Sequence, residues 1–307
     1  MPNSEDMRDR TMKDVCVVTG GTGGIGRAAV REMSKHARVL FCDVNQEKID
    51  AFTQELSGEG IEAVGMMCDV SDPVECAALA KAAVSLGNVT AVIHLAGLTP
   101  TFSAYPDIVR VDCLGTMNIN EAFYKVMNGG CILDICSCVA HFIPKEKYPA
   151  RVFELALTDK KAFYDAMVDM IGKTGEGKQA SNMAYVFGRC FVYWYARKCA
   201  YSFGREKGIR VVTVSIGFVE TPMSRADLEA GGSSYEERLA PQMSYSAFGR
   251  PGTVEEVAFL FSTVVDPRNS YLSGCDIYFD NGCDAGGYHG QSVPYDPASN
   301  PYQPGKT

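Results

Sequence analysis

The stretch VCVVTGGTGGIG, residues 15–26, decides how this chain folds. Its apolar, β-branched first half predicts a strand, its glycines predict a tight turn, and residues 27–35 have the pattern of a helix. The N-terminus of such a helix presents free N–H groups and the positive end of its dipole to an anion. A glycine-rich turn alone is compatible with plain turn chemistry, but its place at the first strand-to-helix junction favours a dinucleotide site. The candidate contact residues are Gly20, Thr22, Gly24, Ile25 and Gly26.

The composition is typical of a soluble globular protein. Of 307 residues, 46% are hydrophobic and 21% are charged, which is enough to bury a large core. The net charge of −8 argues against a nucleic-acid partner or an anionic membrane surface. No apolar run approaches the roughly 20 residues of a membrane span, and the first dozen residues lack the apolar core of a secretory signal. We therefore expect a cytoplasmic protein with no nucleic-acid or membrane partner.

The twelve cysteines lie mostly in apolar runs and form no CxxC pair. This pattern predicts reduced, buried thiols rather than disulfides or a zinc site. His94 lies inside an apolar segment, where a core histidine is a better interpretation than a ligand. No cluster of His, Cys and Asp has metal-binding spacing, so we expect no metal.

Strand-like and helix-like segments alternate along the chain. After the opening strand, we expect strands at residues 37–43, 61–67, 91–97, 131–136, 210–216 and 275–279. Helices are expected at residues 45–56, 73–86, 107–127, 182–206 and 254–264. Continuous apolar strands separated by helices predict an α/β fold with a doubly wound parallel sheet, covered on both faces. We predict a single domain over residues 13–283, after a flexible N-terminus (1–12) and before a C-terminal tail (284–307).

One segment before Tyr185 interrupts this alternation. Residues 141–181 contain two helical patterns and then a glycine-rich loop at residues 172–178. We interpret the segment as a helical insertion, which serves either as an interface and stability element or as part of the substrate pocket. Further on, residues 221–248 mix Met, Ser, Gly and charged residues, a composition typical of a mobile flap over a site.

Several motifs occur in the order of a known family. They are Thr19-Gly20-x-x-x-Gly24-x-Gly26, Asp69-Val70, Leu95-Ala96-Gly97, Ser137, and Ser215-Ile216-Gly217-x-x-x-Thr221. Together they make residues 15–282 resemble the short-chain dehydrogenase/reductase family, which implies a Rossmann sheet and a nicotinamide cofactor. The resemblance implies cofactor contacts from Asp69, Val70, Ala96, Gly97, Gly217, Val219 and Thr221. The insertion followed by Asn182-Met183-Ala184-Tyr185 is similar to the bacterial 3α-hydroxysteroid dehydrogenase/carbonyl reductase branch.

The same resemblance implies that Tyr185 is the catalytic base and Ser137 its hydrogen-bonding companion. A free tyrosine has a pKa of about 10, and the family places a lysine one helical turn later, whose charge favours the phenolate. Here that position holds Arg189, which shares a helix face with Tyr185. An arginine stays charged and can donate to the cofactor ribose, but it cannot release a proton into a relay. We expect both residues to act in catalysis and in cofactor binding.

A second departure from the family is Asp112. The segment Val111-Asp112-Cys113-Leu114-Gly115-Thr116 resembles the family's Val-Asn-x-x-Gly-Thr, whose asparagine helps to hold a water relay. An ionised aspartate accepts hydrogen bonds but cannot donate one. Asp112 either takes part in catalysis or pairs with a nearby cation, for which Arg189 is a candidate.

The choice of cofactor depends on Asp43, at the end of the second predicted strand. A carboxylate there can accept hydrogen bonds from the adenosine ribose and repels a 2′-phosphate. Relatives that use NADP usually carry a basic residue in the glycine turn or after this strand, where this chain has Gly23 and Val44. We therefore predict NAD, although Asp43 could also be a simple helix cap before Asn45.

These observations predict an NAD-dependent oxidoreductase that interconverts a secondary hydroxyl and a ketone on a small hydrophobic substrate, such as a hydroxysteroid or bile acid. One alternative is a catalytically impaired NAD-binding sensor or scaffold, and another is a reductase of a small carbonyl compound. We expect a homodimer or homotetramer. The aromatic residues Phe191, Tyr193, Trp194, Tyr195 and Tyr201, which follow Tyr185, are expected to pack between helices in that oligomer.

Overall fold

The chain forms one seven-stranded, wholly parallel sheet with the strand order β3-β2-β1-β4-β5-β6-β7. The computed structural model describes residues 14–230, 232 and 234–287. The strands are β1 (Asp14–Thr19), β2 (Arg38–Asp43), β3 (Ala63–Met67), β4 (Asn88–His94), β5 (Cys131–Ser137), β6 (Arg210–Ile216) and β7 (Asp276–Phe279). This arrangement confirms the predicted doubly wound α/β fold. The expected N-terminal segment 1–12 and most of the tail lie outside the described residues.

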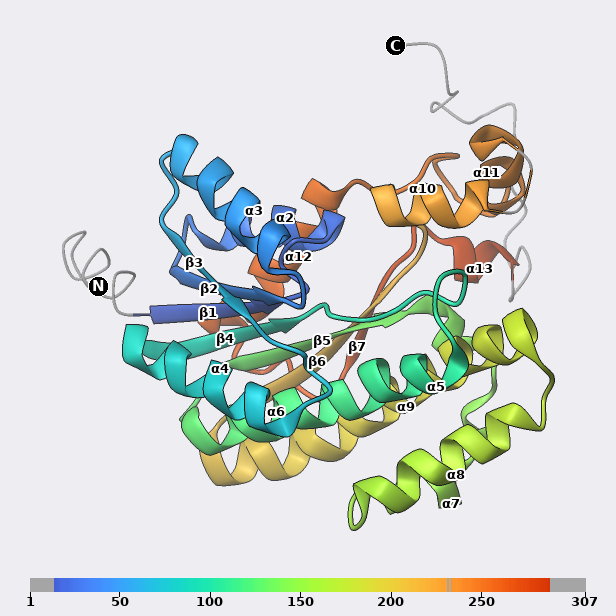
Figure 1. Cartoon of the computed structure of the whole chain (residues 1–307), viewed down its shortest axis with the longest axis horizontal. Helices are drawn as coiled ribbons and strands as arrows, with labels where there is room; N and C mark the ends of the chain where they lie inside the picture. Colours follow the sequence, from blue (N-terminus) through green and yellow to red (C-terminus); the bar gives the residue numbers. More distant parts are fainter. Residues whose placement is uncertain (1–13, 231, 233, 288–307) are drawn as a thin grey trace.

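Helices cover both faces of the sheet (Figure 1). One face carries α2 (Gly24–Met33), α3 (Gln46–Gly58) and α12 (Val254–Val265). The other carries α4 (Pro73–Leu86), α6 (Gly115–Val126) and α9 (Gly177–Lys207). Both faces are apolar because alternate residues of each strand point to opposite sides. Val15 and Val17 of β1 join the α4/α6/α9 core, whereas Cys16 and Val18 join the α2/α3/α12 core.

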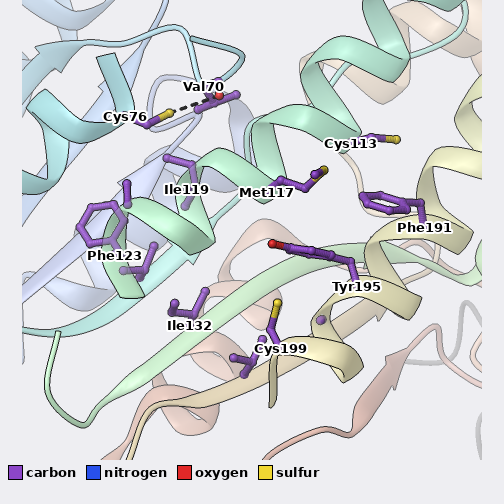
Figure 2. Packing of buried hydrophobic residues seen from close by; sticks show 14 of the residues in the cluster. Val70, Cys76, Cys113, Met117, Ile119, Phe123, Ile132, Phe191, Tyr195 and Cys199 are labelled. Carbon is purple, nitrogen blue, oxygen red and sulfur yellow. Dashed lines mark hydrogen bonds between the residues drawn. The ribbon is translucent and has the colours of Figure 1, made fainter. Parts of the chain in front are cut away.

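The larger core packs α6 and α9 against the sheet, as Figure 2 shows around Met117, Ile132 and Phe191. Thiols contribute to this packing, and Cys76 donates a hydrogen bond to the carbonyl oxygen of Val70 at 3.2 Å (Figure 2). Ten of the twelve cysteines are buried, and all twelve are free. Buried thiols behave as small apolar side chains, as the sequence predicted.

The helix expected over residues 107–127 is interrupted. It consists of α5 (Tyr105–Ile108), a π-helix η1 (Val109–Leu114) and then α6. A π-helical turn inserts a residue into the hydrogen-bond ladder and changes the direction of nearby side chains. Asp112 lies in this π-helical turn, where it is 1% exposed. No motif in this part of the sequence indicates the interruption.

The segment before Tyr185 forms two helices, α7 (Ala150–Leu155) and α8 (Lys160–Gly172), which lie outside α9 (Figure 1). Lys160 of α8 contacts Glu121 of α6 at 2.7 Å, and Phe163 packs on Phe191 of α9 at a ring distance of 4.4 Å. The expectation that Phe191 and its aromatic neighbours pack in an oligomer is therefore wrong for Phe191, which is fully buried within the chain. The loop expected at residues 172–178 is shorter than predicted, because α9 begins at Gly177.

The segment expected to be a flap forms two short helices, α10 (Pro222–Glu229) and α11 (Tyr235–Met243). They lie beyond the carboxyl ends of the strands (Figure 1). At the end of the described chain, α13 (Cys283–Gly287) includes the first residues of the expected tail. The smaller helices η2 (Cys138–His141), η3 (Lys145–Lys147) and η4 (Pro267–Asn269) connect these elements.

Candidate active site

A cleft of about 720 Å³ opens at the carboxyl ends of the strands. In open parallel sheets this edge is where ligands bind, because the loops from several strands meet there. Most residues that the sequence singled out line this cleft: Gly20, Thr22, Gly24, Ile25, Gly26, Asp43, Asp69, Val70, Ala96, Gly97, Tyr185, Arg189 and Thr221. Asp112, Ser137, Gly217 and Val219 are not among the lining residues.

The glycine turn between β1 and α2 forms one end of the cleft. Gly20 has a φ of +65°, a conformation that side chains disfavour. A Cβ on Gly26 would lie 2.1 Å from the carbonyl oxygen of Gly20, so the turn closes only around glycine. Gly23 caps α2 without a side-chain hydrogen bond, which leaves the first N–H groups of the helix available to an anion. This cradle fits the pyrophosphate of a dinucleotide.

Asp43 lies beside this turn and holds it to the end of β2. Its Oδ2 accepts hydrogen bonds from the backbone N–H and hydroxyl of Thr22, and its Oδ1 accepts from the N–H of Val44 at 2.8 Å. Lys48, on the first turn of α3, lines the same part of the cleft. Lys48 was not among the residues predicted from the sequence, because only the packing of α3 brings this side chain to the cleft.

Asp69 lies after β3, also on the cleft wall. Burial alone would raise the pKa of its carboxyl group, but hydrogen bonds from Ser71 and the charge of Arg110 outweigh this, so the pKa is lowered. Arg110 lies 3.3 Å from Asp69 and 3.2 Å from Asp107, and it lines the cleft. Arg110, two residues before Asp112, was also not predicted from the sequence as a cleft residue.

Tyr185 and Arg189 lie one turn apart on α9, on the cleft wall. The Arg189 guanidinium carbon is 4.9 Å from the centroid of the Tyr185 ring, within cation–π range. Arg189 Nη2 lies 2.9 Å from Asp112 Oδ2, and Nη1 donates to the carbonyl oxygen of Ile135 at 3.2 Å. The pairing of Asp112 with Arg189, which the sequence left as one possibility, is therefore present.

This ion pair is almost completely buried, with side-chain exposures of 8% for Arg189 and 0% for Asp112. Burial raises the pKa of Asp112, and the Arg189 charge and the N–H of Leu98 oppose that rise. Burial also disfavours the charged form of Arg189, but Asp112 and Tyr185 outweigh it and raise its pKa. A cation is thus fixed next to the Tyr185 ring by a buried carboxylate.

Ser137 ends β5 and is 9% exposed. Its hydroxyl accepts a hydrogen bond from the N–H of Val139 at 3.4 Å and caps η2. Gly217 and Val219 lie behind the cleft, since the N–H of Gly217 donates to Phe279 at 2.9 Å and Val219 is 5% exposed. Thr221 lines the cleft and forms the capping box of α10 with Ser224.

The outer wall of the cleft is partly apolar. Leu98 and Phe102, from the loop after β4, and Met223 of α10 line it. Phe102 is 62% exposed and Met223 is 50% exposed. Thr99 Oγ1 donates to Asp227 Oδ1 at 3.1 Å, which connects this loop to α10. Ser181, the last residue of the predicted insertion, lies on α9, and its hydroxyl donates to the carbonyl oxygen of Ser103 in this loop at 2.9 Å.

In the described part of the chain, no group of three or more His, Cys, Asp or Glu side chains could hold a metal ion. No helix among the described residues is both long and apolar enough to cross a membrane.

Comparisons with known proteins identify the family to which this fold belongs. Residues 14–150 match the family described as short chain dehydrogenase, and residues 167–284 match the family described as enoyl-(acyl carrier protein) reductase. A granaticin polyketide synthase putative ketoacyl reductase from Streptomyces violaceoruber is 30% identical over 219 residues, which cover 69% of this chain and 70% of the relative. The chain belongs to the short-chain dehydrogenase/reductase family. It is therefore an oxidoreductase of a family that uses nicotinamide cofactors.

The finer branch within this family is not distinguished by similarity. The 3-alpha-hydroxysteroid dehydrogenase/carbonyl reductase of Comamonas testosteroni is 26% identical over 274 residues, covering 88% of this chain and 96% of the relative. An actinorhodin polyketide ketoreductase of similar fold, solved as a single-residue variant with NADPH, has a TM-score of 0.69 at 24% identity and covers 88% of this chain and 97% of its own. The short-chain dehydrogenase/reductase fold is thus common to relatives with different substrates.

Proposed function

We propose that this short-chain dehydrogenase/reductase uses NAD to interconvert a secondary hydroxyl and a ketone on a hydrophobic substrate, with hydroxysteroids and bile acids as the first class to test. The observation that carries the proposal is the placement of Tyr185 and Arg189 on the same cleft as the glycine turn. One end of that cleft suits a pyrophosphate, and the other holds a phenol beside a fixed cation.

In the proposed reaction, the phenolate form of Tyr185 takes the proton from the substrate hydroxyl during oxidation, and the phenol form gives a proton to the substrate oxygen during reduction. Arg189 stabilises the phenolate, and Asp112 holds the guanidinium in place. Ser137 is proposed to donate a hydrogen bond to the substrate oxygen, because its oxygen only accepts from the Val139 N–H and its hydroxyl hydrogen stays available. A bound nicotinamide supplies the hydride acceptor or donor. An arginine does not pass a proton onward, so we infer that the Tyr185 proton leaves by water in the cleft.

The preference for NAD is proposed from Asp43. Its carboxylate lines the cleft next to the glycine turn, where it would accept from ribose hydroxyls and repel a phosphate. Asp69, Val70, Ala96, Gly97 and Thr221 are proposed to complete the cofactor site. Gly217 and Val219 would contribute only through the backbone that leads to Thr221. Lys48 and Arg110, which line the same cleft, are the residues that would favour NADP instead, so the two cofactors need direct comparison.

The apolar character of the substrate is proposed from Leu98, Phe102 and Met223 on the outer wall. When an apolar ligand covers exposed side chains of this kind, the removal of apolar surface from water makes the free energy of binding more favourable. The Comamonas testosteroni relative is named a hydroxysteroid dehydrogenase, which makes hydroxysteroids a sensible first panel. The names of other relatives, such as the acetoacetyl-CoA reductase of Synechocystis, support a second panel of smaller carbonyl compounds. We propose a homodimer or homotetramer as the working assembly.

One observation favours a second candidate, a nucleotide-binding sensor or scaffold with impaired catalysis. Ser137 does not line the cleft, and its hydroxyl caps η2. A protein that binds NAD without turnover would retain the glycine turn and Asp43 and would need neither Ser137 nor Tyr185 in a reactive position.

The test measures absorbance of the reduced cofactor with purified protein. NAD and NADP are compared with hydroxysteroids and simple secondary alcohols, and NADH and NADPH are compared with small ketones. We expect turnover with NAD, with the highest kcat/KM on a hydroxysteroid. A preference for NADP would contradict the role of Asp43. Submicromolar NADH binding with no turnover on any of the three panels would contradict the enzyme proposal and support the sensor.

A further inference from the structure

A buried polar row crosses three neighbouring strands behind the cleft. His94 of β4 pairs in register with Thr19 of β1 on one side and with Asp134 of β5 on the other. All three residues are at most 2% exposed. Each lies two positions from a residue of the α4/α6/α9 core, namely Val17, Val92 and Ile132, so the three side chains share that face of the sheet.

The hydrogen bonds of the Thr19 hydroxyl determine which ring nitrogen of His94 carries the proton. Its Oγ1 accepts hydrogen bonds from the backbone N–H groups of Leu95 and Ala96, both at 3.1 Å. A hydroxyl has two acceptor positions and one hydrogen, so the hydrogen goes to its third partner, His94 Nδ1, at 2.7 Å. His94 Nδ1 is therefore an acceptor, and the ring proton lies on Nε2. Burial, with a smaller contribution from the Arg189 charge, lowers the pKa of His94 to about 3, which keeps the ring neutral.

The backbone that Thr19 holds leads directly to the Arg189–Asp112 pair. After Leu95 and Ala96 comes Gly97, where an added Cβ would lie 2.7 Å from Arg189 Nη2 and 3.3 Å from Asp112 Oδ1. The next N–H, of Leu98, donates to Asp112 Oδ1 at 2.8 Å. Residues 95–98 thus connect the Thr19 hydroxyl at one end to the buried ion pair at the other.

The other side of the imidazole faces Asp134. Because the two ring nitrogens point in nearly opposite directions and Nδ1 faces β1, Nε2 points toward β5. In the described part of the chain, neither His94 Nε2 nor Asp134 Oδ1 has a hydrogen-bond partner. Asp134 Oδ2 accepts from the Asn120 side chain of α6 at 2.8 Å. Buried polar atoms of this kind are costly unless they are paired, directly or through a buried water.

We propose that His94 is a positioning residue for the cleft: its Nδ1 accepts from the Thr19 hydroxyl and so orients it, and the Thr19 oxygen holds residues 95–98 against the Arg189–Asp112 pair. This proposal rests on the proposed function, because Leu95, Ala96, Gly97 and Arg189 line the cleft in which the cofactor would bind. It assigns a role to a histidine that touches neither cofactor nor substrate.

The test compares two substitutions of similar size. In His94→Asn the side-chain oxygen can replace Nδ1 as an acceptor for Thr19, whereas His94→Leu removes the acceptor. We expect the NADH dissociation constant, measured by fluorescence, to rise about tenfold in His94→Leu and less than threefold in His94→Asn, since a tenfold change corresponds to the loss of one hydrogen bond. Free energies of unfolding are measured on the same samples, so that affinity changes are separated from loss of fold.

A double-mutant cycle with Thr19→Val shows whether His94 acts through Thr19. We expect the double variant Thr19→Val/His94→Leu to bind NADH as weakly as Thr19→Val alone. Independent, multiplying effects would overturn the proposal. So would equal losses of stability in His94→Asn and His94→Leu with wild-type NADH affinity in both, because that result assigns His94 to packing only.

A spectroscopic readout is independent of nucleotide binding and of whether His94→Leu folds. The chain has four histidines, so the ¹⁵N imidazole signals can be assigned by single substitutions. In the wild type we expect His94 to be neutral, with the proton on Nε2, between pH 5 and 8, which spans the usual histidine pKa of about 6.5. A proton on Nδ1 would overturn the proposal. If the wild-type protein shows this tautomer but binds neither NADH nor NADPH, the proposed function fails and the positioning claim fails with it, whereas the Thr19–His94 bond stands.

Discussion

The two ends of the cleft are built in different ways. At the glycine-turn end, backbone geometry makes the site: a positive φ at Gly20, a contact at Gly26 that excludes a Cβ, and the open N-terminus of α2. At the other end, which we propose to be catalytic and call the catalytic end, side chains from two elements make it. Asp112 comes from the π-helix η1, and Tyr185 and Arg189 come from α9, where Arg189 also donates to a backbone carbonyl of β5. A backbone-built site is fixed by local sequence, whereas a side-chain-built site depends on how distant elements pack.

The two ends of the cleft also differ in their energetic cost to folding. The glycine-turn end needs only the absence of side chains. Its cost is the conformational entropy that the glycines lose when the chain folds. The catalytic end removes two opposite charges from water, and the pair is stable only while both partners are present. Substitutions at the catalytic end should therefore affect folding more than substitutions of equal size at the turn.

The largest expected effect is at the ion pair. Asp112→Asn leaves Arg189 buried without a carboxylate, and we expect a loss of about 3–5 kcal/mol in the free energy of unfolding. The double variant Asp112→Asn/Arg189→Met removes both charges and should be more stable than Asp112→Asn alone. Urea denaturation of the two variants and the wild type measures this. Equal stability of Asp112→Asn and the wild type would show that the pair contributes nothing to folding.

The second-largest expected effect is a pH dependence of the free energy of unfolding, which arises from Asp134 behind the catalytic end. Burial raises the pKa of Asp134 to about 7, and the hydrogen bond from Asn120 limits that rise. In the unfolded chain the pKa is about 3.9, so between these values the folded state holds a proton that the unfolded state releases. The Asp134 contribution is thus complete below about pH 4 and is lost as pH rises through about 7, by roughly 2–4 kcal/mol.

The isosteric variant Asp134→Asn lacks this titration. We expect its free energy of unfolding to match the wild type near pH 4 and to exceed it near pH 8, as measured by urea denaturation across that range. Parallel pH profiles for the two proteins would mean that Asp134 is ionised in the folded state throughout.

The smallest effect on stability is expected at the glycine turn. Gly26→Ala places a Cβ against the Gly20 carbonyl, and we expect a loss of about 1–3 kcal/mol together with loss of NADH binding. Gly58→Ala, at the end of α3, is the matched control, because nothing lies within 4 Å of its Cβ. That control should keep NADH affinity and gain a few tenths of a kcal/mol. If Gly26→Ala binds NADH like Gly58→Ala, the turn is not the nucleotide cradle.

The sequence predicted the glycine-turn end well because each requirement there is local. The β1–turn–α2 order and the position of Asp43 at the end of β2, where it lines the cleft, follow from short motifs. At the catalytic end, the i, i+4 spacing predicted that Tyr185 and Arg189 lie close together, because both are on one helix. That spacing says nothing about partners from other elements. The π-helical turn that brings Asp112 to Arg189 has no sequence signal, because it depends on packing against α9.

Three further features could not be predicted from the sequence, because each depends on how distant elements pack. Lys48 and Arg110 occupy helical positions that only tertiary packing places on the cleft. The aromatic side chain of Phe191 was expected at an oligomer interface, but α8 covers it with Phe163. His94 was correctly interpreted as a buried histidine, and its partner Thr19 lies on a strand far away in sequence.

The central claim, that Tyr185 beside Arg189 is a working catalytic base, is tested most directly by comparing wild type and Tyr185→Phe on the best substrate of the panel. Both proteins are measured for NADH affinity and for the rate of NADH formation. We predict equal affinity within threefold and a fall in kcat of about 10²–10⁴-fold in Tyr185→Phe, the usual contribution of a general base. Equal kcat for the two proteins would contradict the claim and remove Tyr185 from the chemistry.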